Sequence, residues 1–152
     1  MRIRELHRET WVNCERDMVF EFFTDPDNLL KVTPTDIPVE ILNKSDPVIT
    51  LGTLVELKMK LYGFVPVKWQ TEITEWSPPD YFIDQQPKGP YRFWEHTHRF
   101  VEKNGGTLII DHLRYAVPGY FLEPLIYRLF VKNSLDHIFD YRQQHYPEIF
   151  EE

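Results

Sequence analysis

Hydrophobic and polar residues alternate with a period of two along most of the chain. The first such segment is Ile3–Val12, and alternation of this kind predicts a half-buried strand. Turn residues separate the further alternating segments, which are Val39–Lys44, Leu54–Tyr62, Val67–Trp76, Tyr81–Gln86, Arg92–Glu102 and Thr107–Val117. Because the connections are short, neighbouring strands are expected to pair antiparallel. The pattern predicts a meander of about six to seven strands.

Two short helices are predicted between the first strand and the second. Asn13 is placed to cap one of them, and its apolar stripe consists of Met18, Val19, Phe22 and Phe23. Asp25 as the cap and Pro26 at the first helical position begin the other helix. That helix is expected to end before Thr33-Pro34, because a residue that precedes proline disfavours the helical conformation.

From Phe121 onward the period becomes that of a helix. This helix is expected to run to about Tyr146, where Pro147 ends it. One face carries Leu122, Leu125, Ile126, Leu129 and Phe130 and continues through Asn133 and His137. A different face carries Leu135, Ile138 and Phe139. The second half of the helix is therefore expected to pack against a further element, with the two short helices as candidates.

A curved antiparallel sheet closed by a long helix is an α+β arrangement. We expect one such domain over residues 1–152, since no linker or repeat divides the chain. Aromatic residues make up 15% of the chain, which is high for a globular protein. The rings either fill the space between helix and sheet or line a pocket for a ligand, and the pattern leaves both possibilities open.

Charge and cysteine content exclude several classes of function. The net charge is −7, which argues against binding nucleic acid or an anionic membrane surface, since both require clustered Lys and Arg. Cys14 is the only cysteine, so an intrachain disulfide and a cysteine zinc site are excluded. No apolar run has the length of a signal sequence or of a membrane span. We expect a cytoplasmic protein.

The register of the strands predicts which side chains share the inner face of the sheet. Closing the Lys103–Gly106 turn places His98 opposite Asp111 and His96 opposite Leu113. Extension through the other turns adds Trp69, Thr71, Ile73, Glu75, Phe82, Asp84, Gln86, Trp94, Phe100 and Tyr115 to this face. Val55, Leu57, Met59 and Leu61 join it if the turn near Gly63 is of odd length or if a bulge lies there. The inner face is thus predicted to be aromatic and aliphatic with polar residues embedded in it.

The embedded polar set is the sharpest feature of the sequence. Its members are Asp84, Gln86, His96, His98 and Asp111, with Tyr115, Asn133 and His137 as further candidates. A buried polar group without a partner costs about 1–3 kcal/mol, so these groups must satisfy one another or a ligand. Three interpretations stay open: a closed network in which Asp111 holds the ring N–H of His98, a set that orients a ligand, or a general acid–base pair.

Metal and cofactor chemistry find little support in the sequence. His96, His98 and Asp111 are of metal-ligating types, but two histidines at alternate positions of a strand with one carboxylate are a weak pattern. The motifs of serine hydrolases, nucleotide-binding loops and zinc peptidases are absent from the chain. We expect neither a metal nor a cofactor.

The chain resembles the SRPBCC superfamily, which includes START domains, polyketide cyclases and aromatases, and plant pollen allergens. The resemblance is carried by Val19–Leu29 with Thr33-Pro34, by Trp69–Trp76 with Pro78-Pro79, by the segment FIDQQPKGPYRFWEHTHRF at Phe82–Phe100, and by Asp111–Pro118. It is closest to bacterial single-domain ligand-binding proteins described as polyketide cyclase- or dehydrase-like. It implies a helix-grip fold with a deep cavity, used elsewhere in the superfamily for sterols, phospholipids, hormones, coenzyme Q and polyketides. No common catalytic motif transfers to this chain.

Three hypotheses of function follow. In the first, a monomer or homodimer binds a small apolar or amphipathic molecule, such as a lipid, a polyketide or an isoprenoid. In the second, the protein is a polyketide cyclase or dehydratase that uses His98 with Asp111. In the third, it is a protein-interaction module with a filled core. The residues expected to contact a ligand are Trp69, Phe82, Asp84, Gln86, Trp94, His96, His98, Phe100, Asp111, Tyr115, Asn133 and His137.

Overall fold

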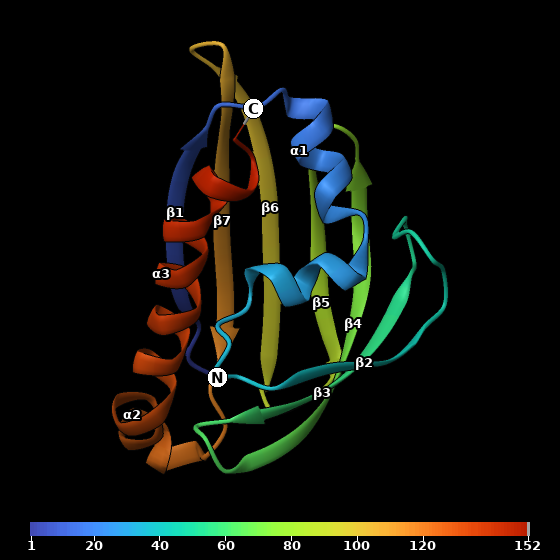
Figure 1. Ribbon diagram of the computed structural model, residues 1–152. Coiled ribbons are helices and arrows are strands. Elements are labelled where there is room, and N and C mark those ends of the chain that lie inside the picture. Colours follow the sequence, from blue (N-terminus) through green and yellow to red (C-terminus); the bar gives the residue numbers. More distant parts are fainter. Residues whose placement is uncertain (152) are drawn as a thin grey trace.

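A computed structural model of the protein describes residues 1–151 as one antiparallel sheet with helices on one face (Figure 1). The sheet has seven strands in the order β1-β7-β6-β5-β4-β3-β2. Their bounds are β1 Arg4–Val12, β2 Val39–Lys44, β3 Leu54–Leu61, β4 Val65–Ser77, β5 Tyr81–Lys88, β6 Phe93–Lys103 and β7 Gly106–Ala116. This agrees with the meander that the alternating pattern predicts.

The helices lie together on the inner face of the sheet (Figure 1). After β1 come α1, Arg16–Phe23, and the 3₁₀ helix η1, Pro26–Val32. The C-terminal helical segment consists of η2 Tyr120–Leu122, α2 Glu123–Ile126, the π-helical turn η3 Tyr127–Val131, and α3 Lys132–Ile149. The expected order of strand, two short helices, meander and gripping helix is therefore confirmed, and with it the helix-grip fold.

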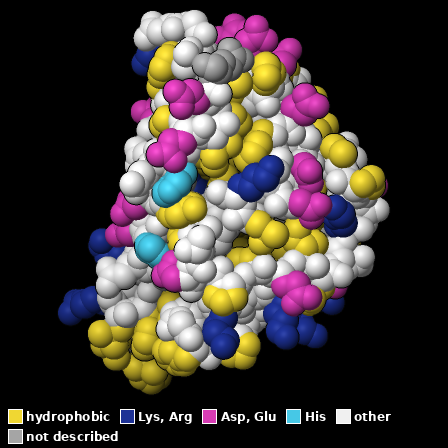
Figure 2. Space-filling view, in the orientation of Figure 1, with side chains coloured by type: hydrophobic (Ala, Val, Ile, Leu, Met, Phe, Trp, Pro, Cys, Tyr) yellow, Lys and Arg dark blue, Asp and Glu magenta, His cyan; other side chains and the backbone are white. Residues whose placement is uncertain are grey.

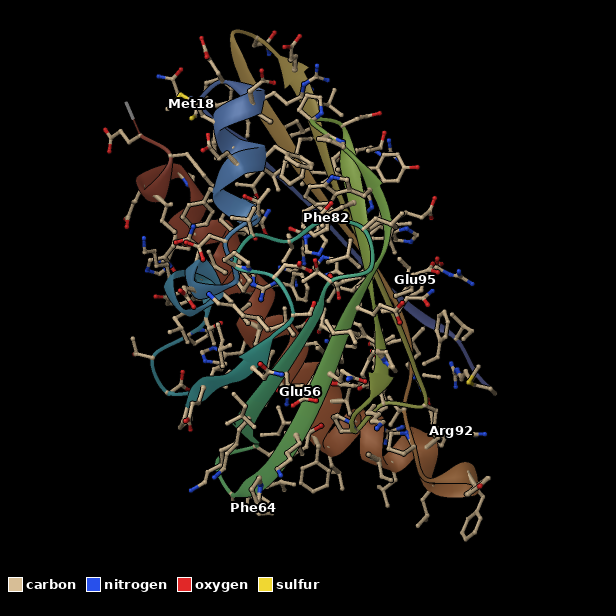
Figure 3. The ribbon with its side chains drawn as sticks, turned by 90° about the vertical axis from the view of Figure 1, so that its right-hand side faces the viewer. Met18, Glu56, Phe64, Phe82, Arg92 and Glu95 are labelled. Atoms are coloured by element: carbon tan, nitrogen blue, oxygen red, sulfur yellow. The ribbon has the colours of Figure 1, made fainter. Side chains whose placement is uncertain are left out.

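The strand register of the sheet centre is as predicted. His98 pairs with Asp111 and His96 with Leu113 across β6 and β7. Asp84 pairs with His96 across β5 and β6. The β3–β4 turn has the odd length that the pattern requires, since Leu61 pairs with Val65 around three residues. In Figure 3 Phe82 lies between sheet and helices, whereas Glu95 lies on the outer side.

Glu75 is an exception, because it is exposed instead of facing inward. The register of β4 against β5 shifts between Ile73 and Glu75, so two residues of β4 oppose one residue of β5 there. Such a bulge reverses the alternation beyond it. Trp76 consequently takes the inward position, where its ring packs against Phe20 and Phe82.

The ends of two helices differ from the expectation. Helix α1 begins at Arg16 with Glu15 at the cap position and no side-chain cap, so Asn13 does not cap it. Asp25 does cap η1, accepting a hydrogen bond from the backbone N–H of Asp27. Helix α3 continues through Pro147 to Ile149. The final turn contributes Phe150, which packs against Phe22 and Phe23 and so offsets the backbone bond that proline removes.

The core lies between the sheet and the helices. On α3 the buried residues are Leu135, Phe139 and Tyr146, so the face predicted to contact a further element is the one that covers the sheet. The other stripe, with Leu122, Leu125, Leu129 and Phe130, is exposed instead. Among residues 1–151, none of the helices combines the length and hydrophobicity needed to cross a membrane.

Candidate functional site

A cavity of about 200 Å³ lies between the sheet and the helices. Strands β3 to β6 form its floor, η1 and the end of α1 form one wall, and α3 forms the other. Its lining is mostly apolar and aromatic, as in small-molecule sites generally. It exceeds the roughly 150 Å³ apolar cavity that suffices to hold a benzene molecule. The core is therefore not filled by its own rings, which argues against the filled-core hypothesis.

Half of the residues expected to contact a ligand line this cavity, namely Trp69, Phe82, Asp84, Trp94, His96 and His98. The two tryptophan rings meet edge to face with centroids 4.7 Å apart. Phe82 stacks on the His98 ring at 4.3 Å. The lining also contains polar side chains, of which Asp84, His96 and His98 form a contiguous patch; the others are Asp25, Asn28, Thr71, Ser134 and Arg142.

The polar patch consists of two carboxylate–imidazole pairs, Asp84–His98 and Asp111–His96. Nε2 of His98 lies 2.6 Å from Oδ2 of Asp84, and Nε2 of His96 lies 2.9 Å from Oδ1 of Asp111. The two imidazole rings are in contact, with centroids 3.7 Å apart and planes tilted by 31°. Each carboxylate also lies 3.9 Å from a nitrogen of the other histidine. The expectation that Asp111 holds His98 is therefore wrong.

The crossed pairing follows from the reach of the side chains. His98 and Asp111 are directly opposite in the register, yet each forms its short contact with a neighbour diagonally across the sheet. Diagonal neighbours lie within reach of long or aromatic side chains. Asp111 is bonded by His96, is 3% exposed and lies outside the cavity lining.

Both carboxylates of the patch are ionised near neutral pH. Burial raises the pKa of Asp84. The hydrogen bond to His98 and the charges of His98, His96 and Arg142 lower it by more than burial raises it, so the pKa of Asp84 lies below its usual value. The same opposition, with His96 as the hydrogen-bond partner, leaves the pKa of Asp111 below its usual value. An ionised carboxylate can only accept a hydrogen bond, so each Nε2 carries the proton.

His98 is neutral under the same conditions. Burial and then the charge of His96 lower its pKa by more than Asp84 and Asp111 raise it. With its proton on Nε2, the ring keeps Nδ1 as an acceptor. A neutral imidazole hydrogen-bonded to a carboxylate can orient a polar ligand group or accept a proton.

The patch also holds the donor types of a metal site. One ligand atom each from Asp84, His96 and His98 lie within 4.8 Å of one another. The ring nitrogens nearest to the carboxylates are already used in hydrogen bonds, which a metal ion would have to replace. That this protein uses no metal stays a prediction.

Arg142 is one residue of the site that the sequence pattern did not reveal. It lines the cavity, its Nε donates to the carbonyl of Val32 at 3.2 Å, and its guanidinium lies over the Phe139 ring. Among residues 1–151 it forms no ion pair with a carboxylate. Arg142 follows Leu135 by seven residues and therefore lies on the same helix face, and this spacing could have identified it.

The remaining expected residues lie outside the cavity. Phe100 is fully buried against Phe20 and Phe23. Gln86 closes the β5–β6 turn by bonding the backbone of Tyr91 at both N–H and carbonyl. The ring of Tyr115 is buried and packs edge-on against that of Tyr91.

Asn133 and His137 face away from the inner polar set, contrary to expectation. Both are exposed, and His137 bonds Asp36 at 2.9 Å. They line a separate hollow of about 430 Å³ between α3 and the β3–β4 turn. Their place follows from the helix face described above, since the stripe they continue is the exposed one.

Comparisons with known proteins match the fold. No protein-family model and no curated protein matches the sequence. Among solved structures, the protein TTHA0849 from Thermus thermophilus has a TM-score of 0.75 at 18% identity, with 95% of each chain covered. Norcoclaurine synthase from Thalictrum flavum has a TM-score of 0.67 at 16% identity, over 99% of this chain and 88% of that one.

A third similar structure is the major latex-like protein 151 of Panax ginseng, with a TM-score of 0.65 at 15% identity over 94% of this chain and 97% of that one. These likenesses extend over nearly the whole chain. The chain therefore has the helix-grip fold.

Proposed function

We propose that this protein binds one small, largely apolar molecule in the cavity between sheet and α3. The observation that carries the proposal is a cavity whose lining is mostly apolar and contains the Asp84–His96–His98 patch and Arg142. Trp69 and Trp94 offer ring surface to the apolar part of a lipid, polyketide or isoprenoid-like ligand. Because a pocket of this kind fixes orientation through few polar groups, the ligand carries one polar end. A cytoplasmic setting fits this role.

The polar end is expected to meet Arg142 and His98. Among residues 1–151 Arg142 forms no ion pair, so its N–H groups can bond a ligand, and the ring of His98 lines the cavity. A hydroxyl or carbonyl oxygen can accept from Arg142. Asp84 fixes the orientation of the His98 ring through its 2.6 Å contact. Asp111 in turn bonds His96, whose ring lies against that of His98.

Binding is tested by native mass spectrometry of the purified protein and by a panel of fatty acids, isoprenols and aromatic polyketides. Tryptophan fluorescence reports on the cavity because Trp69 and Trp94 line it. A ligand at one hundred times its Kd should stabilise the fold by about 2.7 kcal/mol, visible as a rise in Tm. A panel and an extract that never change mass, fluorescence or Tm would contradict the proposal.

A matched pair of variants separates the cavity from the surface. Ser134 lines the cavity, and its neighbour Asn133 is exposed. Ser134→Phe should fill the space and weaken ligand binding by at least about tenfold, which corresponds to 1.4 kcal/mol. Asn133→Phe adds the same ring outside and should bind as the wild type does. Equal affinity in the two variants would place the ligand elsewhere.

Proton transfer on the bound molecule is a second candidate function. It is favoured by the neutral His98 paired with ionised Asp84 at the cavity wall, and norcoclaurine synthase shows that the same fold supports an enzyme. Exchange of deuterium from solvent into a bound ketone, followed by NMR, tests it. His98→Gln should abolish exchange while retaining binding. Exchange that persists in the variant would remove His98 from such a reaction.

A further inference from the structure

An exposed apolar patch covers the α2 end of the molecule. We define the α2 patch as Tyr120, Phe121, Leu122, Leu125 and Leu129. Tyr120 is 80% exposed and Phe121 is 88% exposed. Figure 2 shows these hydrophobic side chains gathered at the lower left, where Figure 1 places α2. Contiguous exposed apolar groups of this size indicate a contact surface.

The backbone is built to project these rings outward. Gly119 and Tyr120 both adopt positive φ, at 112° and 51°, and Leu122 closes the turn by bonding the carbonyl of Gly119. A positive φ is unfavourable for a bulky residue such as tyrosine. Strain of this kind in an ordered turn suggests that the projection has a use.

The segment is also anchored firmly to the sheet. Arg4 of β1 donates two hydrogen bonds to Glu123, at 2.8 and 2.9 Å, and its guanidinium lies 3.5 Å from the centre of the Tyr127 ring. Such a bidentate pair is geometrically specific. The α2 patch is therefore a fixed surface of the fold.

The exposed charges within residues 117–134 and at Arg92 are positive, although the chain as a whole carries −7. Between residues 117 and 134 the only acidic residue is Glu123, which is buried and paired with Arg4. Arg128 is exposed and without an ion pair among the described residues, and Arg92 reaches over the Tyr120 ring at 5.0 Å. Figure 3 places Arg92 and Phe64 at the same end of the molecule as α2.

We propose that the α2 patch docks this protein on the surface of an anionic lipid bilayer. Rings and leucines would enter the headgroup region, where Tyr and Phe side chains are favoured. Arg92 and Arg128 would meet lipid phosphates, and each such cation adds to the attraction near an anionic surface. In a symmetric contact between two copies the same cations would approach each other, so the charge favours a bilayer over a second copy.

The position of the patch beside the interior of the protein supports this partner. Leu129 belongs both to the patch and to the hollow between α3 and the β3–β4 turn. That hollow and the cavity share Leu61 and Ser134 in their linings. A protein docked by this end would hold the hollow close to the lipid. Docking itself does not depend on the ligand proposed above, and the two can fail separately.

Flotation with lipid vesicles tests the proposal. The purified full chain, without added ligand, should float with vesicles of phosphatidylcholine and phosphatidylglycerol and bind vesicles of phosphatidylcholine alone more weakly. Binding to the anionic vesicles should decrease as salt rises, since salt screens exposed charges. A wild-type protein that does not float with the anionic vesicles overturns the proposal.

Matched variants locate the surface. Phe121→Ser, Leu129→Ser and Arg128→Glu should each weaken vesicle binding, with at least about a tenfold loss for Phe121→Ser. The controls are Leu51→Ser, at a leucine 62% exposed compared with 57% for Leu129, and Lys103→Glu at the β6–β7 turn. Controls that lose binding equally would refute the location.

Sedimentation of the free protein completes the test. A dimer that Phe121→Ser dissociates, combined with unchanged vesicle binding, would assign the patch to a second copy and overturn the proposal. Unfolding in urea checks that the variants keep the wild-type fold, which is expected because every substituted side chain is exposed.

Discussion

Replacing Asp111 by asparagine tests whether the two carboxylate–imidazole pairs differ in role. Asp111 lies beneath His96 and is nearly fully buried, whereas Asp84 faces the cavity with its side chain 13% exposed. Asp111→Asn should therefore act mainly on stability, and Asp84→Asn mainly on ligand binding. The two substitutions are chemically identical, so each serves as the control of the other.

The magnitude follows from the contact of 2.9 Å between His96 and Asp111. Asparagine can still accept the His96 N–H through its oxygen, but the bond loses its charge. Bonds to charged groups contribute about 1.5–3 kcal/mol and neutral ones about 0.5–1.5 kcal/mol, so the expected loss is about 1.5 kcal/mol. Asp111→Ala leaves the His96 N–H without a partner and should cost about 3–5 kcal/mol.

The assay is urea unfolding over a range of pH. The folded-state pKa of Asp111 is below the usual value for aspartate, about 3.9. Its ionised form therefore stabilises the fold above that pH, and the contribution disappears as pH falls through the folded-state pKa. The wild type should exceed Asp111→Asn in stability near neutral pH and approach it in acid. Equal stability at neutral pH, or a difference that does not change with pH, would refute the reasoning.

Three further predictions concern other parts of the fold. Phe100→Ala should lower the free energy of unfolding in urea by about 3–5 kcal/mol, because Phe100 is fully buried. Phe64 is 67% exposed, so Phe64→Ala should change that free energy by less than about 0.5 kcal/mol. Similar losses of stability in the two variants would contradict the packing described. Asp25→Ala removes the cap of η1 and should cost about 1 kcal/mol in the same assay, and an unchanged unfolding midpoint would count against the cap. Glu123 has a pKa lowered by its hydrogen bond to Arg4, against the effect of burial, so Glu123→Gln should speed amide exchange in the α2 segment above about pH 4.3 and lose that effect in acid.

The alternating pattern was sufficient to predict the fold and the inner face. Turn lengths fixed the register because a slip of one residue would have exposed the whole apolar set. For this reason the pattern put Trp69, Asp84 and His98 on one face, and all three line the cavity. A bulge depends on local backbone geometry, so the pattern had no means of excluding Glu75 from that face.

Strand register alone could not predict which side chains bond one another within the polar patch. Register gives the residue directly opposite, but the two imidazoles reach diagonally, from His98 to Asp84 and from His96 to Asp111. These contacts depend on side-chain rotamers that an alternating pattern does not encode. The types of the polar groups were predictable, and their pairing was not.

The helical period of the last segment left open which of two apolar faces is buried. It showed one stripe ending at Phe130 and another through Leu135 and Phe139, and a period alone does not say which stripe meets the sheet. The α2 segment lies beside the edge strand β1 (Figure 1), where Arg4 bonds Glu123, and the first stripe is exposed there. Two apolar stripes on different faces of one helix require two partners. The sheet is the partner of the second, so the first, with Leu125 and Leu129 exposed, indicates a partner outside this chain.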